Sequence, residues 1–147
     1  MTGTLLDLAK RMASIEAEIA TDGNKASIEV ATAIVGDLVY HTPVDTSKAL
    51  SSWLVTFDEP SQVKGAAIFP GKQGSTFRAS AAEALALAKL VLKDKKPGQD
   101  IYITNNQPYI RKLNDGGHSQ QPHAFVERAA LLGRKVAARF KVGNKNV

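Results

Sequence analysis

The sequence lacks cysteine altogether. This excludes disulfide bonds, thiolate nucleophiles and cysteine-ligated zinc, and it is typical of a chain that folds in a reducing compartment such as the cytosol. The chain also lacks any run of about 18 apolar residues, the length that a membrane-spanning helix needs. Its N-terminal segment interrupts apolar residues with Asp7, Lys10 and Arg11, so it predicts neither a signal peptide nor a membrane anchor.

Catalytic motifs are missing as well. The sequence has no G-x-S-x-G, no Walker loop and no dinucleotide-binding fingerprint. The segment "PGKQGSTF" at 70–77 has a lysine and two glycines, but not in the order of a phosphate-binding loop. The adjacent carboxylates Asp58 and Glu59 lie in an expected turn, where solvated charge is usual. We therefore predict no catalytic residue and no cofactor, and expect a protein that is not an enzyme.

The composition is that of a folded globular protein. The chain has 147 residues, of which 44% are hydrophobic and 22% are charged. These values are near the averages of globular proteins, and the length allows a core without disulfides or metals. Neither a repeat nor a low-complexity linker divides the chain. We predict a single domain over residues 1–147, with a frayed tail at 141–147.

The formal net charge of +5 is unevenly distributed. Residues 1–45 carry three basic and seven acidic groups, a net charge of −4, whereas residues 46–147 carry sixteen basic and seven acidic groups, a net charge of +9. Two interpretations stay open. The charges are scattered over a solvated surface, or the acidic end of one copy contacts the basic end of another copy or a charged partner.

The N-terminal third has the apolar spacing of a helix. Large apolar side chains recur there at intervals of three and four, at Leu5, Leu8, Met12, Ile15 and Ile19. The polar stretch "TDGN" at 21–24 indicates either a break and restart or a helix that continues with a defect, and the helical spacing then resumes up to Tyr40. Because the residue before a proline is pushed out of the α region, Pro43 ends this helix near His41.

The middle of the chain alternates strand and helix signals. "WLVTF" at 53–57 is rich in β-branched and aromatic residues, and "VKGAAIFPG" at 63–71 is its expected partner in a hairpin. "AAEALALAKLVLK" at 81–93 predicts a helix with a cap formed by Ser80 and Glu83. "IYITNN" at 101–106 predicts a third strand.

The C-terminal segment at 124–142 predicts an amphipathic helix. Its expected packed face consists of Phe125, Ala129, Leu132, Val136 and Phe140. Trp53 and Phe57 are expected to join this face in the core. The pattern predicts an α+β fold: an N-terminal helix, broken or not near 21–24, a small and mostly antiparallel sheet, an inserted Ala/Leu-rich helix and a C-terminal amphipathic helix.

One group of side chains resembles a metal-ligand set. His118, His123 and Glu127 lie close together in the sequence, and imidazoles with a carboxylate bind zinc or iron in hydrolytic enzymes. The spacing argues against this, because the two histidines of a helical zinc motif lie four residues apart on one helix face. A small metal-dependent hydrolase or nuclease is kept as an alternative, but we predict no metal site.

A lysine cluster raises the question of nucleic-acid binding. Four lysines lie near one another at Lys89, Lys93, Lys95 and Lys96. Lysines at a helix C-terminus interact favourably with the helix dipole, and the segment lacks the aromatic residues that stack on bases. Sequence-specific recognition is not expected. Non-specific contact with the DNA backbone needs only positive surface, so a DNA-binding accessory protein is a second alternative.

The stretch "HTPVDTSKALSSW" at 41–53 combines a rigid proline, side chains suited to capping a turn and the only tryptophan. The order of proline, Asp-Thr, leucine and Ser-Ser-Trp resembles the signature "P-x-D-T-G-x-L-x-x-S" of the tail-completion proteins of tailed bacteriophages. These are also described as head–tail joining, neck or minor tail proteins. Ser47 stands where the family usually has glycine.

A second segment, "NNQPYIRKLNDGGHSQQPHAFVERA" at 105–129, follows the order of the same family. The matching residues are Asn106, Pro108, Tyr109, Leu113, Gly116, Pro122 and Phe125. The resemblance covers about residues 25–140. The insertion at 71–96 is longer than in compact members of the family, so the subfamily and the place in the neck stay open.

The resemblance implies a structural virion protein. Copies would form a homo-oligomeric ring at the head–tail junction, reached from the host cytoplasm during assembly, around the channel through which DNA passes. The ring would contact a connector, adaptor or stopper on the head side and a tail terminator or tail tube on the tail side, with no membrane and no sequence-specific DNA contact. Ring copy number and tail type stay open.

The resemblance and the loop chemistry also assign roles to residues. Motif residues expected to be structural are Pro43, Asp45, Thr46, Leu50, Ser52, Trp53, Tyr109, Pro122 and Phe125. Residues expected at interfaces are Lys72, Arg78, Asn114, His118, Gln120, Arg128, Lys135 and Arg139.

Overall fold

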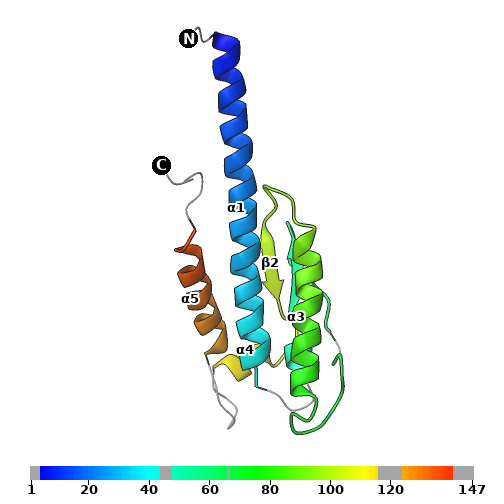
Figure 1. Cartoon of the computed structure of the whole chain (residues 1–147). Coiled ribbons are helices and arrows are strands. Elements are labelled where there is room, and N and C mark those ends of the chain that lie inside the picture. The colour runs from blue at the N-terminus through cyan, green and yellow to red at the C-terminus, as the bar shows by residue number, and fades with distance from the viewer. Residues whose placement is uncertain (1–3, 44–47, 66, 116–123, 141–147) are drawn as a thin grey trace.

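The computed structural model describes residues 4–43, 48–65, 67–115 and 124–140. In these residues five helices and a two-stranded sheet follow one another as α1 Leu5–His41, α2 Lys48–Ser51, β1 Leu54–Phe57, α3 Phe77–Lys93, β2 Ile101–Thr104, α4 Ile110–Asn114 and α5 Phe125–Ala137 (Figure 1). The α+β class that the sequence predicts is confirmed.

Helix α1 is a single helix of 37 residues. It begins with a capping box, in which Thr4 Oγ1 accepts from the backbone N–H of Asp7 at 3.2 Å and the Asp7 carboxylate accepts from the N–H of Thr4 at 3.1 Å. The helix continues through 21–24 without a break. The hydroxyls of Thr21 and Ser27 donate to carbonyls four residues earlier, so these polar side chains are satisfied within the helix. The expected end at His41 is confirmed.

The sheet pairs β1 with β2 in antiparallel orientation, with Leu54 opposite Thr104 and Phe57 opposite Ile101. The predicted hairpin between 53–57 and 63–71 is therefore wrong. Side chains bind the backbone of the second segment in place of a strand: Asn106 donates to the carbonyl of Val63, and Gln107 donates to that of Gly65. These long-range hydrogen bonds satisfy the backbone groups that a strand ladder would use.

The same segment is held on its other side by serines. The hydroxyl of Ser51 accepts from the N–H of Ile68 at 3.1 Å, and that of Ser80 accepts from the N–H of Phe69 at 3.2 Å. Ser80 was expected to cap a helix starting at 81, and this is wrong. Helix α3 already begins at Phe77, and Ser80 is fully buried within it.

Helices α3 and α5 lie along opposite sides of α1 (Figure 1). One cluster of buried apolar side chains joins the three helices and β1: Ala31, Val35, Leu38, Val39, Leu50, Trp53, Val55, Ala81, Ala84, Ala88, Leu92, Phe125 and Ala129. Trp53 and Phe125 are core residues as predicted, and Phe57 packs partly buried against them. The α1 residues of this cluster begin only at Ala31, so the N-terminal half of the helix contributes nothing to the core.

Helix α5 approaches α1 closely at a glycine. A Cβ on Gly133 would lie 2.5 Å from Ile34 Cδ1, so only glycine allows this spacing of the two helices without a shift. Phe125 and Ala129 are buried as predicted, whereas Leu132 and Val136 are only partly buried. The prediction that Phe140 completes the packed face is wrong, because the helix ends at Ala137 and Phe140 is exposed.

Candidate interaction surface

The two motif segments pack against each other in the core. The indole N–H of Trp53 donates to Thr42 Oγ1 at 2.9 Å, which links the strand entry to the end of α1. The Trp53 ring contacts the Phe125 ring edge to face, with 6.5 Å between ring centroids. Pro43 and Leu50 are buried beside them. These motif residues therefore hold three parts of the chain together.

A polar network supports the same region. Gln107 Nε2 donates to Ser52 Oγ at 2.8 Å and to the carbonyl of Gly65 at 2.6 Å, and Ser52 is fully buried. Asn105 Nδ2 donates to the carbonyl of Ala49 at 2.8 Å. Gln107 was not singled out from the sequence, although it lies between the motif residues Asn106 and Pro108. These side-chain amides and the Ser52 hydroxyl are hydrogen-bonded to one another or to backbone carbonyls, so the network stabilises the fold.

Tyr109 is the remaining motif residue of the expected structural set that the structure describes. Tyr109 is 37% exposed and immediately precedes α4. Asp45, Thr46 and Pro122 lie outside the residues that the structure describes.

The predicted interface residues do not form one surface. Lys72 and Arg78 are exposed on the loop before α3 and on its first turn, whereas Arg128, Lys135 and Arg139 are exposed on or just after α5. Since α3 and α5 flank α1, these cations lie in two parts of the fold, with α1 between them (Figure 1). His118 and Gln120 lie outside the described residues.

Asn114 differs from the other predicted interface residues because its side chain is engaged within the chain. Its Oδ1 accepts from the N–H of Val126 at 2.9 Å, and its Nδ2 donates to both carboxylate oxygens of Glu127 at 2.9 and 3.0 Å. The hydrogen bond from Asn114 lowers the pKa of Glu127 below its ordinary value. Asn114 thus fixes the first turn of α5.

This arrangement also bears on the metal-site alternative. Of its three residues, His118 and His123 lie outside the described residues, and both Glu127 oxygens already accept from Asn114. Within the described ranges, no group of three or more histidine, cysteine, aspartate or glutamate side chains is placed to hold a metal ion.

The lysine cluster contains one cation that is not on the surface. Lys95 is only 7% exposed, and its Nζ donates to Asn24 Oδ1 at 2.7 Å and to the carbonyl of Lys96 at 3.2 Å. Asn24 Nδ2 donates in return to the carbonyl of Lys95 at 3.1 Å. Lys95 is therefore not on the exposed surface that Lys89, Lys93 and Lys96 share, and it ties the chain just after α3 to the middle of α1.

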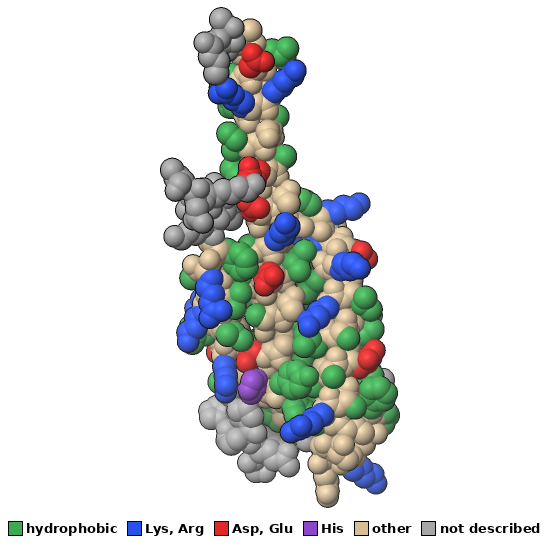
Figure 2. Space-filling view, viewed as in Figure 1, with side chains coloured by type: hydrophobic (Ala, Val, Ile, Leu, Met, Phe, Trp, Pro, Cys, Tyr) green, Lys and Arg blue, Asp and Glu red, His purple; other side chains and the backbone are tan. Residues whose placement is uncertain are grey.

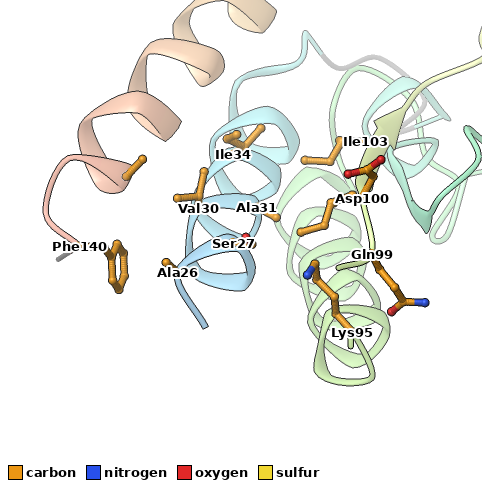
Figure 3. Close-up of a pocket in the computed structure, with 12 residues that line it drawn as sticks. Ala26, Ser27, Val30, Ala31, Ile34, Lys95, Gln99, Asp100, Ile103 and Phe140 are labelled. Atoms are coloured by element: carbon orange, nitrogen blue, oxygen red, sulfur yellow. The ribbon is translucent and has the colours of Figure 1, made fainter. Parts of the chain in front are cut away.

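Lys95 borders an open groove with a volume of about 430 Å³ between α1, β2 and the end of α5 (Figure 3). The lining is mainly apolar and includes Val30, Ile34, Ile103 and Phe140. The hydroxyl in the lining, that of Ser27, is bound to the carbonyl of Gly23. The other polar side chains of the lining are those of Lys95, Gln99 and Asp100.

The most unusual surface is the N-terminal part of α1, residues 5–22, which we call the arm. The arm projects beyond the rest of the molecule, and hydrophobic side chains lie along it in contact with solvent (Figures 1 and 2). Five of them form what we call the apolar stripe, with these exposed fractions: Leu5 86%, Leu8 53%, Met12 62%, Ile15 56% and Ile19 46%. The sequence predicts the helix and its apolar face but not that, among the residues the structure describes, no element covers this face.

Comparison with protein-family models, with curated proteins and with solved structures gives no match. Among the described helices, none combines the length and the apolar character needed to cross a membrane. Function is therefore inferred from the residues and surfaces of this chain.

Proposed function

We propose that this protein acts by binding, as a non-enzymatic structural component of the head–tail joint of a tailed bacteriophage. Copies form a homo-oligomeric ring between the head connector, adaptor or stopper and the tail terminator or tube, and the ring surrounds the DNA channel. The protein reaches the virion from the host cytoplasm. The main support for a binding role is the exposed apolar stripe of the arm.

The stripe has the properties of an interface. Its five large side chains lie in a line about 21 Å long, since a helix rises about 1.5 Å per residue. Burying one leucine or isoleucine side chain contributes roughly 1.5–3 kcal/mol, so covering this half-exposed set contributes on the order of 5 kcal/mol before the costs of association. Contiguous apolar surface of this kind marks an interaction site.

The particular role is supported by the two motif segments. Residues 41–53 and 105–129 resemble the head–tail joining family, and their described residues meet through Trp53, Phe125, Ser52 and Gln107. Segments that resemble one family at two places and pack together are expected of one structural core. The charge pattern supports assembly as well, because an arm with a net charge of −2 projects from a body that is basic in total.

The test is reconstitution with neighbouring neck proteins. The full chain is mixed with the connector and tail-terminator proteins of the same phage, and the products are examined by native mass spectrometry and negative-stain electron microscopy. We expect a ring that contains several copies of this chain. A protein that stays monomeric and joins no ring with any of these partners contradicts the proposal.

A further inference from the structure

The spacing of the apolar stripe defines what kind of element covers it. Its members follow one another at intervals of three, four, three and four residues, the a and d positions of a heptad repeat. A helix with this repeat packs against another helix at a small crossing angle. Leu6, which is also exposed, lies on the opposite side of the arm. The occupant of the stripe is therefore a helix.

The charges beside the stripe select the partner. Arg11 and Glu18 both occupy the g position, Arg11 in the first half of the arm and Glu18 in the second. When two such helices pair in antiparallel orientation, g residues face g residues, and Arg11 of each copy faces Glu18 of the other. The arm is thus complementary in charge to a second, reversed arm, whose Arg11 competes for Glu18 with the interaction that Glu18 makes within its own chain.

The position of α5 decides between the two orientations. Val30 follows Ile19 by eleven residues, which is about three helical turns, so both side chains point to nearly the same side of α1. Helix α5 packs on that side, where Gly133 meets Ile34 and Val30, and its end near Phe140 borders the groove beside Ala26. A parallel partner would bring a second body to the place that α5 occupies, whereas an antiparallel partner has its body at the far end.

We infer that the arm binds the arm of a second copy of this chain as an antiparallel helix pair. Leu8 packs against Ile19 of the second copy and Met12 against Ile15 of the second copy, with the twofold axis between residues 13 and 14. The inference rests on the proposed function only for the premise that the arm is an interface; because a twofold pair closes on itself, the ring contacts of the proposed function lie elsewhere on the chain. Five large side chains per arm make an interface smaller than the roughly 1,200–2,000 Å² of a standard one, so the dimer is expected to be reversible.

The first test measures self-association of the full chain by analytical ultracentrifugation across about 1 to 500 µM. Ile15→Asp places a charge in the stripe and is expected to raise the dimer dissociation constant at least about 100-fold. Leu6→Asp is the matched control, since it adds the same charge to an exposed leucine on the other side of the arm and is expected to leave the dissociation constant within about threefold. A monomer at all concentrations, or equal weakening by both variants, overturns the inference.

The second test exchanges the flanking charges. Arg11→Glu and Glu18→Arg are each expected to weaken the dimer, because each places like charges opposite one another at both ends of the pair. The double variant restores opposite charges and is expected to return the dissociation constant to within about threefold of the original value. A double variant that is weaker than both single variants overturns the charge pairing and with it the antiparallel assignment.

The third test uses the absence of cysteine to read the orientation directly. Leu8→Cys and Ile19→Cys are made as separate variants and oxidised alone or mixed. In the antiparallel pair the two positions are opposite each other, so only the mixture forms a disulfide-linked dimer. Positions eleven residues apart are separated by about 16 Å along the helix, too far for a disulfide. Cross-linking of each variant with itself but not in the mixture overturns the inference.

These results separate the inference from the proposed function. A chain that is monomeric in isolation but joins a ring with neck proteins overturns the arm pair and leaves the proposed function standing. A chain that forms the antiparallel dimer but joins no neck protein overturns the proposed function and leaves the arm pair standing.

Discussion

The hydrogen bond between Trp53 and Thr42 gives the sharpest test of how the core is held together. Thr42→Val keeps the shape of the side chain but removes the oxygen that accepts the indole N–H at 2.9 Å. Trp53 is 8% exposed, so its N–H becomes a buried donor without a partner, which costs about 1–3 kcal/mol. The carbonyl of Leu38 loses the Thr42 hydroxyl but keeps the backbone N–H of Thr42 at 2.9 Å, so no second group is left unsatisfied. We therefore expect the free energy of unfolding to fall by about 2 kcal/mol.

Urea unfolding followed by tryptophan fluorescence measures this change, since Trp53 is the only tryptophan. With a denaturant slope of about 2 kcal/mol per molar, the midpoint falls by about 1 M. Trp53→Phe removes the donor, so Thr42→Val is expected to cost clearly less in that background, as followed by circular dichroism. A loss below about 0.5 kcal/mol in the original background, or equal losses in both backgrounds, refutes the reasoning.

Three further predictions test other contacts. Gly133→Leu forces α5 away from Ile34 and lowers the free energy of unfolding by at least about 2 kcal/mol, measured by urea denaturation, and a stability equal to that of the original chain contradicts the close approach. Asn114→Ala is expected to raise the pKa of Glu127 towards its ordinary value, as measured by an NMR titration. In the original chain the folded-state pKa of Glu127 is lowered, so Glu127 stabilises the fold at pH values above its unfolded-state pKa. This contribution disappears as the pH falls through the folded-state pKa. Lys95→Ala is expected to lower the melting temperature, because the Lys95 side chain is buried and bound to Asn24. Any affinity for duplex DNA, measured by fluorescence titration across salt concentrations, is expected to stay unchanged. A clear loss of affinity would show that the cation faces solvent.

Local sequence patterns predict the helices better than the pairing of the strands. The spacing of apolar residues predicts α1 and α5, and the β-branched run predicts β1, because these signals depend on neighbours in the chain. The partner of β1 depends on contacts across the fold. The segment at 63–71 has the composition of a strand, but Asn106, Gln107 and two serines bind its backbone, and no local pattern reveals those bonds.

The candidate site shows the same limit. The apolar stripe is visible in the sequence, yet its period is the same whether the face is buried or exposed. The difference in length between α1 and the helices packed against it indicates that part of α1 is exposed. A helix of 37 residues is about 55 Å long, whereas α3 with 17 and α5 with 13 residues extend over about 26 and 20 Å. Helices this short, packed side by side with α1, leave a large part of it uncovered.

Lys95 is the opposite case, a charged side chain that is buried. Its neighbours in the sequence are lysines, so composition places it on a charged surface. The fold brings it beside Asn24, seventy-one residues away in the chain, and the two side chains exchange hydrogen bonds in a place that solvent barely reaches. Burial of a cation against neutral partners is a property of tertiary structure and has no local signature.

The continuity of α1 means that the direction in which the arm's apolar side chains point is locked to the orientation of the core. Each residue of an α-helix turns the chain by about 100°, so the deletion of one residue between Ile19 and Ala26 rotates the stripe by about 100° around the helix axis relative to α5. Deletion of seven residues rotates it by only about 20° and shortens the arm by about 10 Å. The helix therefore fixes both how far the stripe lies from the core and which way it points, and the polar residues at 21–24, where a break was one expectation, carry the helix through without interruption.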